Sequence, residues 1–135
     1  MMQTANPELR FRALWLVVGY LLIVLVIYLS LSSSPVTIDT GLPYEDKLFH
    51  FVAYFTLTFW FVQIYHIRHH VILWGIFLLC LGMLLEYLQG FDANRYSEAA
   101  DMIANTLGVI VAMIILSLKG DGILAWFERY ILKAS

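Results

Sequence analysis

The sequence predicts an all-α membrane protein: a four-transmembrane-helix bundle with a short interfacial amphipathic helix near its C-terminus. The composition favours this class, because 61% of the 135 residues are hydrophobic and 13% are charged, whereas soluble domains are about half apolar and about a quarter charged. The apolar residues also fall into four stretches of roughly 20 residues, the length that crosses a bilayer as a helix. The chain length suits one domain, spanning residues 1–135.

Short polar segments separate the expected spans. Ser32–Pro35 follows the first stretch, residues 66–70 divide the second from the third, and residues 90–97 divide the third from the fourth. The first stretch follows Arg10 and Arg12 and resembles a signal peptide, but it is longer than the apolar part of one and no clear cleavage site follows. We therefore interpret it as a retained span. The four helices are expected at Ala13–Leu31, Leu48–Tyr65, Val71–Gln89 and Ala99–Leu118.

The C-terminal segment predicts a fifth helix of another kind. Gly120 and Gly122 break the helix after the fourth span. Residues 123–132 then mix large apolar side chains with Glu128 and Arg129. Such a mixture is typical of a helix that lies on a membrane surface and does not cross it.

Basic residues predict the orientation of the bundle, because short cytoplasmic loops carry an excess of lysine and arginine. With four spans, both termini and the second loop share a side. Two basic residues, Lys47 and Arg95, fall on the other side. The sequence thus predicts a multi-pass protein of the cytoplasmic membrane with cytoplasmic N and C termini; the basic residues on that side are Arg10, Arg12, Arg68, Lys119, Arg129 and Lys133.

Several partner and cofactor classes are not expected. A net charge of −2 disfavours nucleic acid, which binds basic surfaces. The single cysteine, Cys80, cannot form an internal disulfide or a thiolate cluster. The sequence has no cofactor-binding motif. No metal site is expected either, because His66, His69 and His70 match no standard zinc spacing and indicate a basic interfacial loop.

Hydrophilic side chains in or beside the spans are the candidate functional residues. Charge at membrane depth costs from about 2.5 kcal/mol per residue upwards, so such residues are functional candidates by default. In the predicted topology, all eight lie at the outer ends of the second, third and fourth helices or in the loop between them. They are Asp46, Lys47, His50, Glu86, Gln89, Arg95, Asp101 and Asn105.

Helical spacing places these residues on shared faces. Lys47, His50 and Tyr54 follow one another at i, i+3 and i+7, and Asp46 is four residues before His50. Glu86 and Gln89 share a face of the third helix, and Asp101, Asn105 and Gly108 share one of the fourth. Lipid cannot satisfy these polar groups, so we expect them to face a common interior.

Each of these residues has a structural interpretation beside the functional one. Glu86 is either half of an ion pair that fixes helix register or a general base or ligand-binding group. Arg95 is either a solvated loop residue or a phosphate-binding group. Asp101 can simply complement the helix dipole or pair with a cation. Asn105 can form an inter-helix hydrogen bond, and Tyr54 can pack with its hydroxyl satisfied.

The ordered pattern Asp46-Lys47-x-x-His50-x-x-x-Tyr54, Glu86-x-x-Gln89, Arg95 and Asp101-x-x-x-Asn105-x-x-Gly108 resembles the VanZ-like family of small bacterial membrane proteins. The resemblance covers residues 46–108 and the hydropathy on either side. The family's namesake is associated with resistance to the glycopeptide teicoplanin. The resemblance implies a role at the bacterial cell envelope, with a weaker implication for antibiotic susceptibility. It implies no particular reaction.

Two hypotheses of different classes follow. In the first, an outward-facing pocket binds or acts on an anionic envelope component, such as a lipid-linked phosphate. Lys47, His50 and Arg95 would hold the anion, and Glu86 and His50 would be the acid–base pair of any catalysis. Asp46, Tyr54, Gln89, Asp101 and Asn105 would complete the ligand-binding set. In the second hypothesis, the chain is an accessory subunit of a larger membrane complex, and the polar cluster is a buried ion-pair network.

Overall fold

The computed structural model describes residues 9–33, 40–65, 67–118 and 122–133. Ser34, Pro35, His66, Lys119 and Gly120, which entered the sequence interpretation, lie outside this part of the chain. The described residues contain five helices and no strand. The helices are α1 (Arg12–Leu31), α2 (Glu45–Ile64), α3 (Arg68–Gln89), α4 (Ala99–Leu118) and α5 (Ile123–Tyr130).

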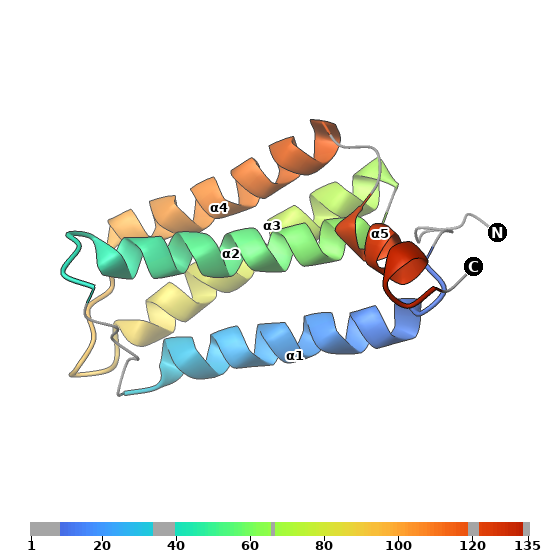
Figure 1. The fold of residues 1–135 in the computed structure, drawn as a ribbon. Coiled ribbons are helices and arrows are strands. Elements are labelled where there is room, and N and C mark those ends of the chain that lie inside the picture. Colours follow the sequence, from blue (N-terminus) through green and yellow to red (C-terminus); the bar gives the residue numbers. More distant parts are fainter. Residues whose placement is uncertain (1–8, 34–39, 66, 119–121, 134–135) are drawn as a thin grey trace.

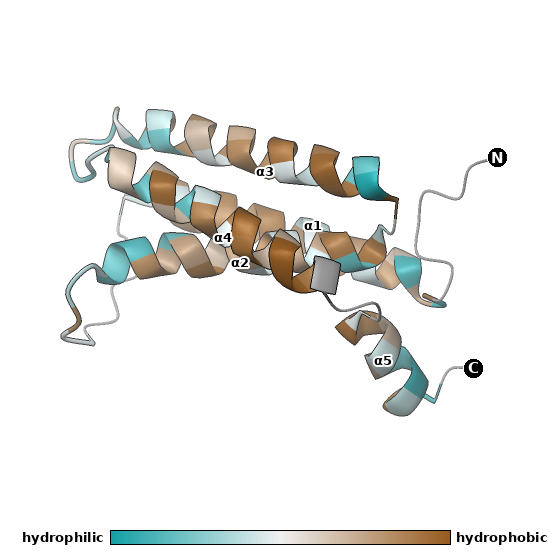
Figure 2. Ribbon diagram, turned by 90° about the horizontal axis from the view of Figure 1, so that it is seen from above, coloured by the Kyte–Doolittle hydropathy of each residue, from teal (hydrophilic) through white to brown (hydrophobic). Residues whose placement is uncertain are grey.

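The prediction of four spanning helices is confirmed at the level of length and composition. The helices α1 to α4 are each long and apolar enough to cross a membrane. Figure 2 shows hydrophobic residues along the middle of these helices, with hydrophilic residues gathered towards their ends. Many of their large apolar side chains face outward, including Val24, Ile76 and Ile114. Apolar surface of this extent requires a lipid environment.

Two helices begin earlier than hydropathy predicts. The helix α2 starts at Glu45, where residue 48 was expected, and α3 starts at Arg68, where residue 71 was expected. In each case the first turn is polar and so escapes a search for apolar runs. Glu45 and Asp46 in the first turn of α2 complement the positive end of the helix dipole. The earlier start of α2 places Asp46 and Lys47 on a regular helix and fixes their directions relative to His50.

Close packing of α2 against α4 forms the centre of the bundle (Figure 1). Gly108 makes this possible, because a Cβ atom at that position would lie 2.5 Å from the backbone oxygen of Phe51. Ala104 and Ala112, one turn to either side of Gly108, are also buried. This small-residue stripe is the packing surface that four-residue spacing predicts.

The apolar core runs between α2, α3 and α4 and against one side of α1. Leu57, Phe61 and Leu78 are almost fully buried there. The ring of Phe61 stacks on Trp74, with centroids 3.8 Å apart and an angle of 12° between the planes. This core holds the helices in register, so the polar ends of α2, α3 and α4 come together.

The short helix α5 packs across the end of the bundle at which α1 begins (Figure 1). It ends at Tyr130, two residues before the predicted limit of 132. Leu124 and Ala125 are buried with Trp15 and Ile64, whereas apolar residues on the opposite face of α5 are exposed. The side-chain oxygen of Gln63 accepts the amide hydrogen of Leu124, at 2.9 Å. The amphipathic character of the segment is thus used in part to dock on the bundle.

Candidate functional site

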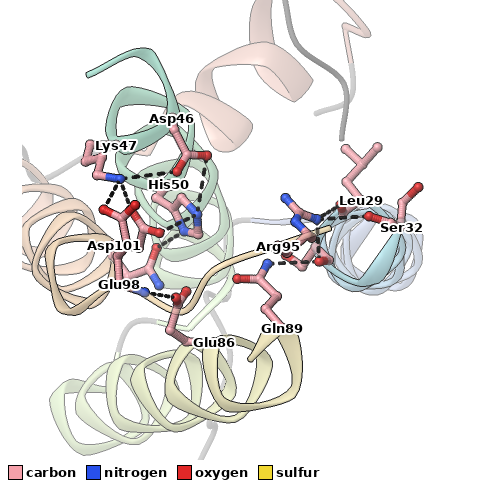
Figure 3. Close-up of polar contacts among 12 residues, drawn as sticks. Leu29, Ser32, Asp46, Lys47, His50, Glu86, Gln89, Arg95, Glu98 and Asp101 are labelled. Carbon is pink, nitrogen blue, oxygen red and sulfur yellow. Dashed lines mark hydrogen bonds and ion pairs between the residues drawn. The ribbon is translucent and has the colours of Figure 1, made fainter. Parts of the chain in front are cut away.

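The site lies at the end of the bundle opposite α5, where the polar ends of α2, α3 and α4 meet the loop of residues 90–98 (Figures 1 and 3). A cavity of about 530 Å³ opens there. Five of the nine residues selected from the sequence line its wall: Asp46, His50, Gln89, Arg95 and Asp101. The other four, Lys47, Tyr54, Glu86 and Asn105, lie behind or beside that wall. The predicted residues therefore form one cluster, in two layers.

Lys47, in the first turn of α2, joins the start of α2 to the start of α4 and contacts three carboxylates. Its Nζ atom lies 2.6 Å from Glu98 Oε2, 3.0 Å from Asp101 Oδ1 and 3.4 Å from Asp46 Oδ2. Asp101 is only 3% exposed, so its charge depends on this pairing. The ammonium charge of Lys47 is therefore used within the protein. Lys47, which the sequence interpretation selected to hold an anion, does not line the cavity.

His50 connects α2 to α4 one turn deeper. Its Nδ1 atom lies 3.0 Å from Asn105 Oδ1, and its Nε2 atom lies 3.9 Å from Asp46 Oδ1 and 3.8 Å from Asp101 Oδ2. Asn105 is buried, and its Nδ2 atom packs over Gly82 beside the ring of Tyr54. The inter-helix hydrogen bond considered for Asn105 is thus formed, with His50 as its partner.

Glu86 is directed at the start of α4. Its Oε1 atom accepts the backbone amide hydrogen of Glu98 at 2.7 Å, directly before the first residue of α4. The side chain is 2% exposed, and Oε2 has no hydrogen-bond partner among the described residues. Glu86 does not line the cavity. In this arrangement it fixes the α3–α4 connection and forms no ion pair with Lys47.

Arg95 and Gln89 cap the C-terminal end of α1 (Figure 3). Arg95 Nη1 donates to the backbone oxygens of Leu29, Ser30 and Ser32, at 3.2, 2.6 and 3.1 Å, and Gln89 Nε2 donates to Ser30 at 2.9 Å. The last carbonyls of a helix lack partners within the helix and carry partial negative charge, so a guanidinium stabilises them. These bonds draw α1 against the 90–98 loop and close one side of the cavity.

Asp92 fixes the turn that carries Arg95. Its Oδ1 atom accepts the backbone amide hydrogen of Asn94 at 2.9 Å, and the amide of Arg95 donates to the backbone oxygen of Asp92 at 3.1 Å. The hydrogen bond from Asn94, assisted by Ser33 and by the positive charge of Arg95, holds the pKa of Asp92 below its ordinary value. The turn therefore keeps its anionic cap throughout the neutral range.

The charges that line the cavity are mostly negative. Four carboxylates face it, against the single guanidinium of Arg95; they belong to Glu45, Asp46, Glu98 and Asp101. Glu45 and Glu98 were not selected from the sequence. The sequence signal for these two residues was their position at the starts of α2 and α4. That position by itself predicts only a favourable interaction with the helix dipole.

A smaller cleft of about 100 Å³ continues from this cavity along α1. Its walls include the apolar side chains of Val26, Leu29, Phe49 and Ala53, and Tyr54 lies at its inner side. His50, Gln89 and Arg95 border both spaces. Charged side chains gather on the wall of the wide chamber, and the narrower groove that it joins runs between α1 and α2 along several apolar side chains.

Comparison of the chain with protein-family models, with curated proteins and with solved structures finds no match.

Proposed function

We propose that this chain is a VanZ-like membrane protein of the bacterial cell envelope whose cavity binds the headgroup of an anionic lipid, such as a lipid-linked phosphate. The observation that carries the proposal is the continuity of a cavity that carries charged side chains with a narrower groove along apolar side chains of α1 and α2, because a lipid has a charged headgroup and an apolar chain. The headgroup lies beside Arg95 and His50, and the first part of the chain follows Leu29 and Phe49.

Charge decides which lipids suit the site. Arg95 is bonded through Nη1 to the end of α1, and it still lines the cavity, where a guanidinium suits phosphate oxygens. The four carboxylates on the wall repel a bare phosphate. The ligand that fits is therefore an anionic headgroup that brings a cation with it, either an amine of its own or a bound metal ion.

The proposed orientation places this cavity on the outer side of the cytoplasmic membrane, with the termini and α5 on the cytoplasmic side. A protein that sequesters a lipid-linked intermediate on that side changes the supply of envelope precursors. This is the route by which a VanZ-like protein would affect susceptibility to glycopeptides. We propose binding and no reaction, because Glu86, the expected general base, faces the backbone of α4 and not the cavity.

A binding experiment tests the proposal. The purified full-length chain in detergent, with Mg²⁺ present as the accompanying cation, is titrated with a long-chain isoprenyl phosphate and with the isoprenyl alcohol of the same length, and dissociation constants are measured by calorimetry. We expect the phosphate to bind at least tenfold more tightly than the alcohol. In Arg95→Gln this preference should fall about tenfold, the loss of one charge-assisted hydrogen bond of about 1.5 kcal/mol.

Arg68→Gln is the matched control, because Arg68 is an exposed arginine at the first turn of α3, at the other end of the bundle. Its binding should equal that of the wild type. If the wild type does not distinguish phosphate from alcohol, or if Arg68→Gln and Arg95→Gln lose the preference equally, the proposed site is wrong.

The accessory-subunit hypothesis also has an observation in its favour. Lys47, its three carboxylates and the cap formed by Glu86 are a network that fixes helix register without a ligand. The partners of Lys47 make the charge-swap test specific: Lys47→Glu combined with Asp101→Lys. If the network is purely structural, the double variant should recover the thermal stability that either single variant loses. Ligand binding should not change in any of these variants.

A further inference from the structure

The tautomer of His50 is fixed by its neighbour. An amide oxygen only accepts hydrogen bonds, so the 3.0 Å contact with Asn105 Oδ1 requires a hydrogen on Nδ1 of His50. In neutral histidine the other nitrogen, Nε2, then carries a lone pair. Nε2 is therefore the atom of His50 that can bind a proton or a metal ion.

Two carboxylate oxygens face the same nitrogen. Asp46 Oδ1 lies 3.9 Å and Asp101 Oδ2 lies 3.8 Å from Nε2, too far for hydrogen bonds. Three electron-pair donors, all within 4.8 Å of one another, therefore surround one point. With no cation at that point the three donors repel one another, whereas a cation placed between them would bind all three.

Lys47 orients the carboxylates without occupying this point. It contacts Asp46 through Oδ2 and Asp101 through Oδ1, and each carboxylate directs its other oxygen towards His50. Asn105 does the same for the histidine, since it holds the nitrogen opposite to the free lone pair. Metal ligands are usually oriented in this way by hydrogen-bonding or charged groups behind them.

We propose that Asp46, His50 and Asp101 bind a single divalent transition-metal ion, with Zn²⁺ the best match to one imidazole and two carboxylates. Ligands of a tetrahedral zinc ion lie about 3.4 Å apart at bonds of about 2.1 Å. The histidine–carboxylate distances of 3.9 and 3.8 Å must shorten by about 0.5 Å, and the carboxylate oxygens, which lie within 4.8 Å of each other, must also come together to reach this geometry. All three residues line the 530 Å³ cavity, so the ion has an entry path and can keep an open position for water or ligand.

The ion also deepens the proposed function. It supplies positive charge to an acidic cavity, which is the cation that a lipid phosphate needs there, and its open position accepts a phosphate oxygen. The metal site itself stands on the three ligands alone. Its test therefore uses the metal without lipid, so that failure of metal binding and failure of lipid binding are separate results.

The experiment is a zinc titration of the full-length chain, purified without a histidine tag and stripped with a chelator. Competition with a chromophoric chelator gives the stoichiometry and the dissociation constant. We expect one Zn²⁺ per chain, bound at micromolar concentration or more tightly, and a higher thermal midpoint with zinc than without. Mn²⁺ should bind more weakly than Zn²⁺.

Matched variants locate the ion. Asp46→Asn and His50→Gln should each weaken binding at least tenfold, because each removes one ligand. Asp92→Asn, which changes a carboxylate that does not line the cavity, should bind as the wild type does. A variant with His66, His69 and His70 all changed to Gln should also bind normally. Circular dichroism of the metal-free proteins checks folding; if His50→Gln does not fold, Asp46→Asn, whose side chain is largely exposed, decides alone.

Two results would overturn the proposal. One is the absence of zinc binding by the wild type at a zinc concentration of about 100 µM in the competition assay. A dissociation constant on the order of 100 µM is the weakest that would matter in a cell. The other is binding that survives both Asp46→Asn and His50→Gln, or that disappears in the histidine-loop variant, since either would place the ion elsewhere.

Discussion

At the scale of single residues, the two cations selected from the sequence for anion binding already have partners within the protein. Lys47 was selected as an anion-binding cation, but three carboxylates surround its ammonium group. Arg95 was selected for the same reason, and its Nη1 donates to three backbone carbonyls at the end of α1 and just after it. The sequence identified both residues as important, because charge near a membrane is costly. It did not identify their partners, since Glu98 and the end of α1 are distant in the chain.

Glu128 is the clearest example of a residue whose importance only the three-dimensional arrangement reveals. In the sequence it is one charge on an amphipathic tail. In the structure it is 2% exposed and accepts hydrogens from the backbone amides of Arg10 and Phe11, at 2.7 and 2.9 Å, and from the indole of Trp15. It thereby caps α1, whose own N-cap side chain makes no capping bond.

We expect Glu128→Ala to destabilise the end of the bundle where α1 begins. Three donors lose their acceptor, and each buried polar group left unpaired costs about 1–3 kcal/mol, so a loss of about 3 kcal/mol in the free energy of unfolding is expected. Denaturant titration followed by tryptophan fluorescence measures it. Glu45→Ala, which removes an exposed carboxylate that accepts a single amide hydrogen from Thr40, is the control and should change stability by less than about 0.5 kcal/mol. Equal stabilities of the two variants would refute this role for Glu128.

At the scale of helices, hydropathy located every span but not every helix end. The range predicted for α4, 99–118, agrees with the structure, and α1 differs by one residue. The errors lie at the starts of α2 and α3, where a polar first turn extends an apolar run. Those turns matter for the candidate site, because Asp46 and Lys47 belong to one of them. The thickness of the membrane sets the length of a spanning helix. The candidate polar residues Asp46 and Lys47 lie in a turn that extends the apolar run of such a helix.

The stripe of small residues on α4 supports a prediction about helix packing. Gly108→Ala should be strongly destabilising, because the new Cβ atom would lie 2.5 Å from Phe51 O and 2.9 Å from Phe55 N, both of which are backbone atoms. Separating α2 from α4 would also pull Lys47 and His50 away from Asp101. We expect a loss of at least about 2 kcal/mol in stability, measured by thermal unfolding in detergent.

Gly75→Ala is the matched control for that substitution. Its Cβ atom would lie 3.1 Å from the sulfur of Met113, the end of a flexible side chain that can move aside. We expect a change within about 1 kcal/mol, with the sign set by the higher helix propensity of alanine. If both substitutions are tolerated equally, close α2–α4 packing does not carry the stability of the bundle.

At the scale of the whole molecule, the sequence correctly predicted that polar residues from three helices converge at one end of the bundle. That inference needed only the order of the helices and the helical period. It predicted a pocket there, but it did not predict the groove beside the pocket or the acidic character of its wall. These depend on Glu45, Glu98 and the placement of α1, and nothing in the spacing of residues along one helix fixes its distance from another.

The orientation in the membrane gives a final prediction. The structure places the 90–98 loop and α5 at opposite ends of the bundle (Figure 1), so a membrane-spanning chain exposes them on opposite sides. In a Cys80→Ala background, Asn94→Cys should react in intact bacterial cells with a thiol reagent that does not cross the cytoplasmic membrane. Lys133→Cys should react only after the cells are opened. Val24→Cys, on the exposed apolar face of α1, should react poorly in both conditions, since lipid surrounds it.

Reaction of Lys133→Cys alone in intact cells would invert the orientation and place the cavity on the cytoplasmic side. Because basic residues favour the opposite result by six to two, we expect the cavity, and any metal ion or lipid bound in it, to face outward.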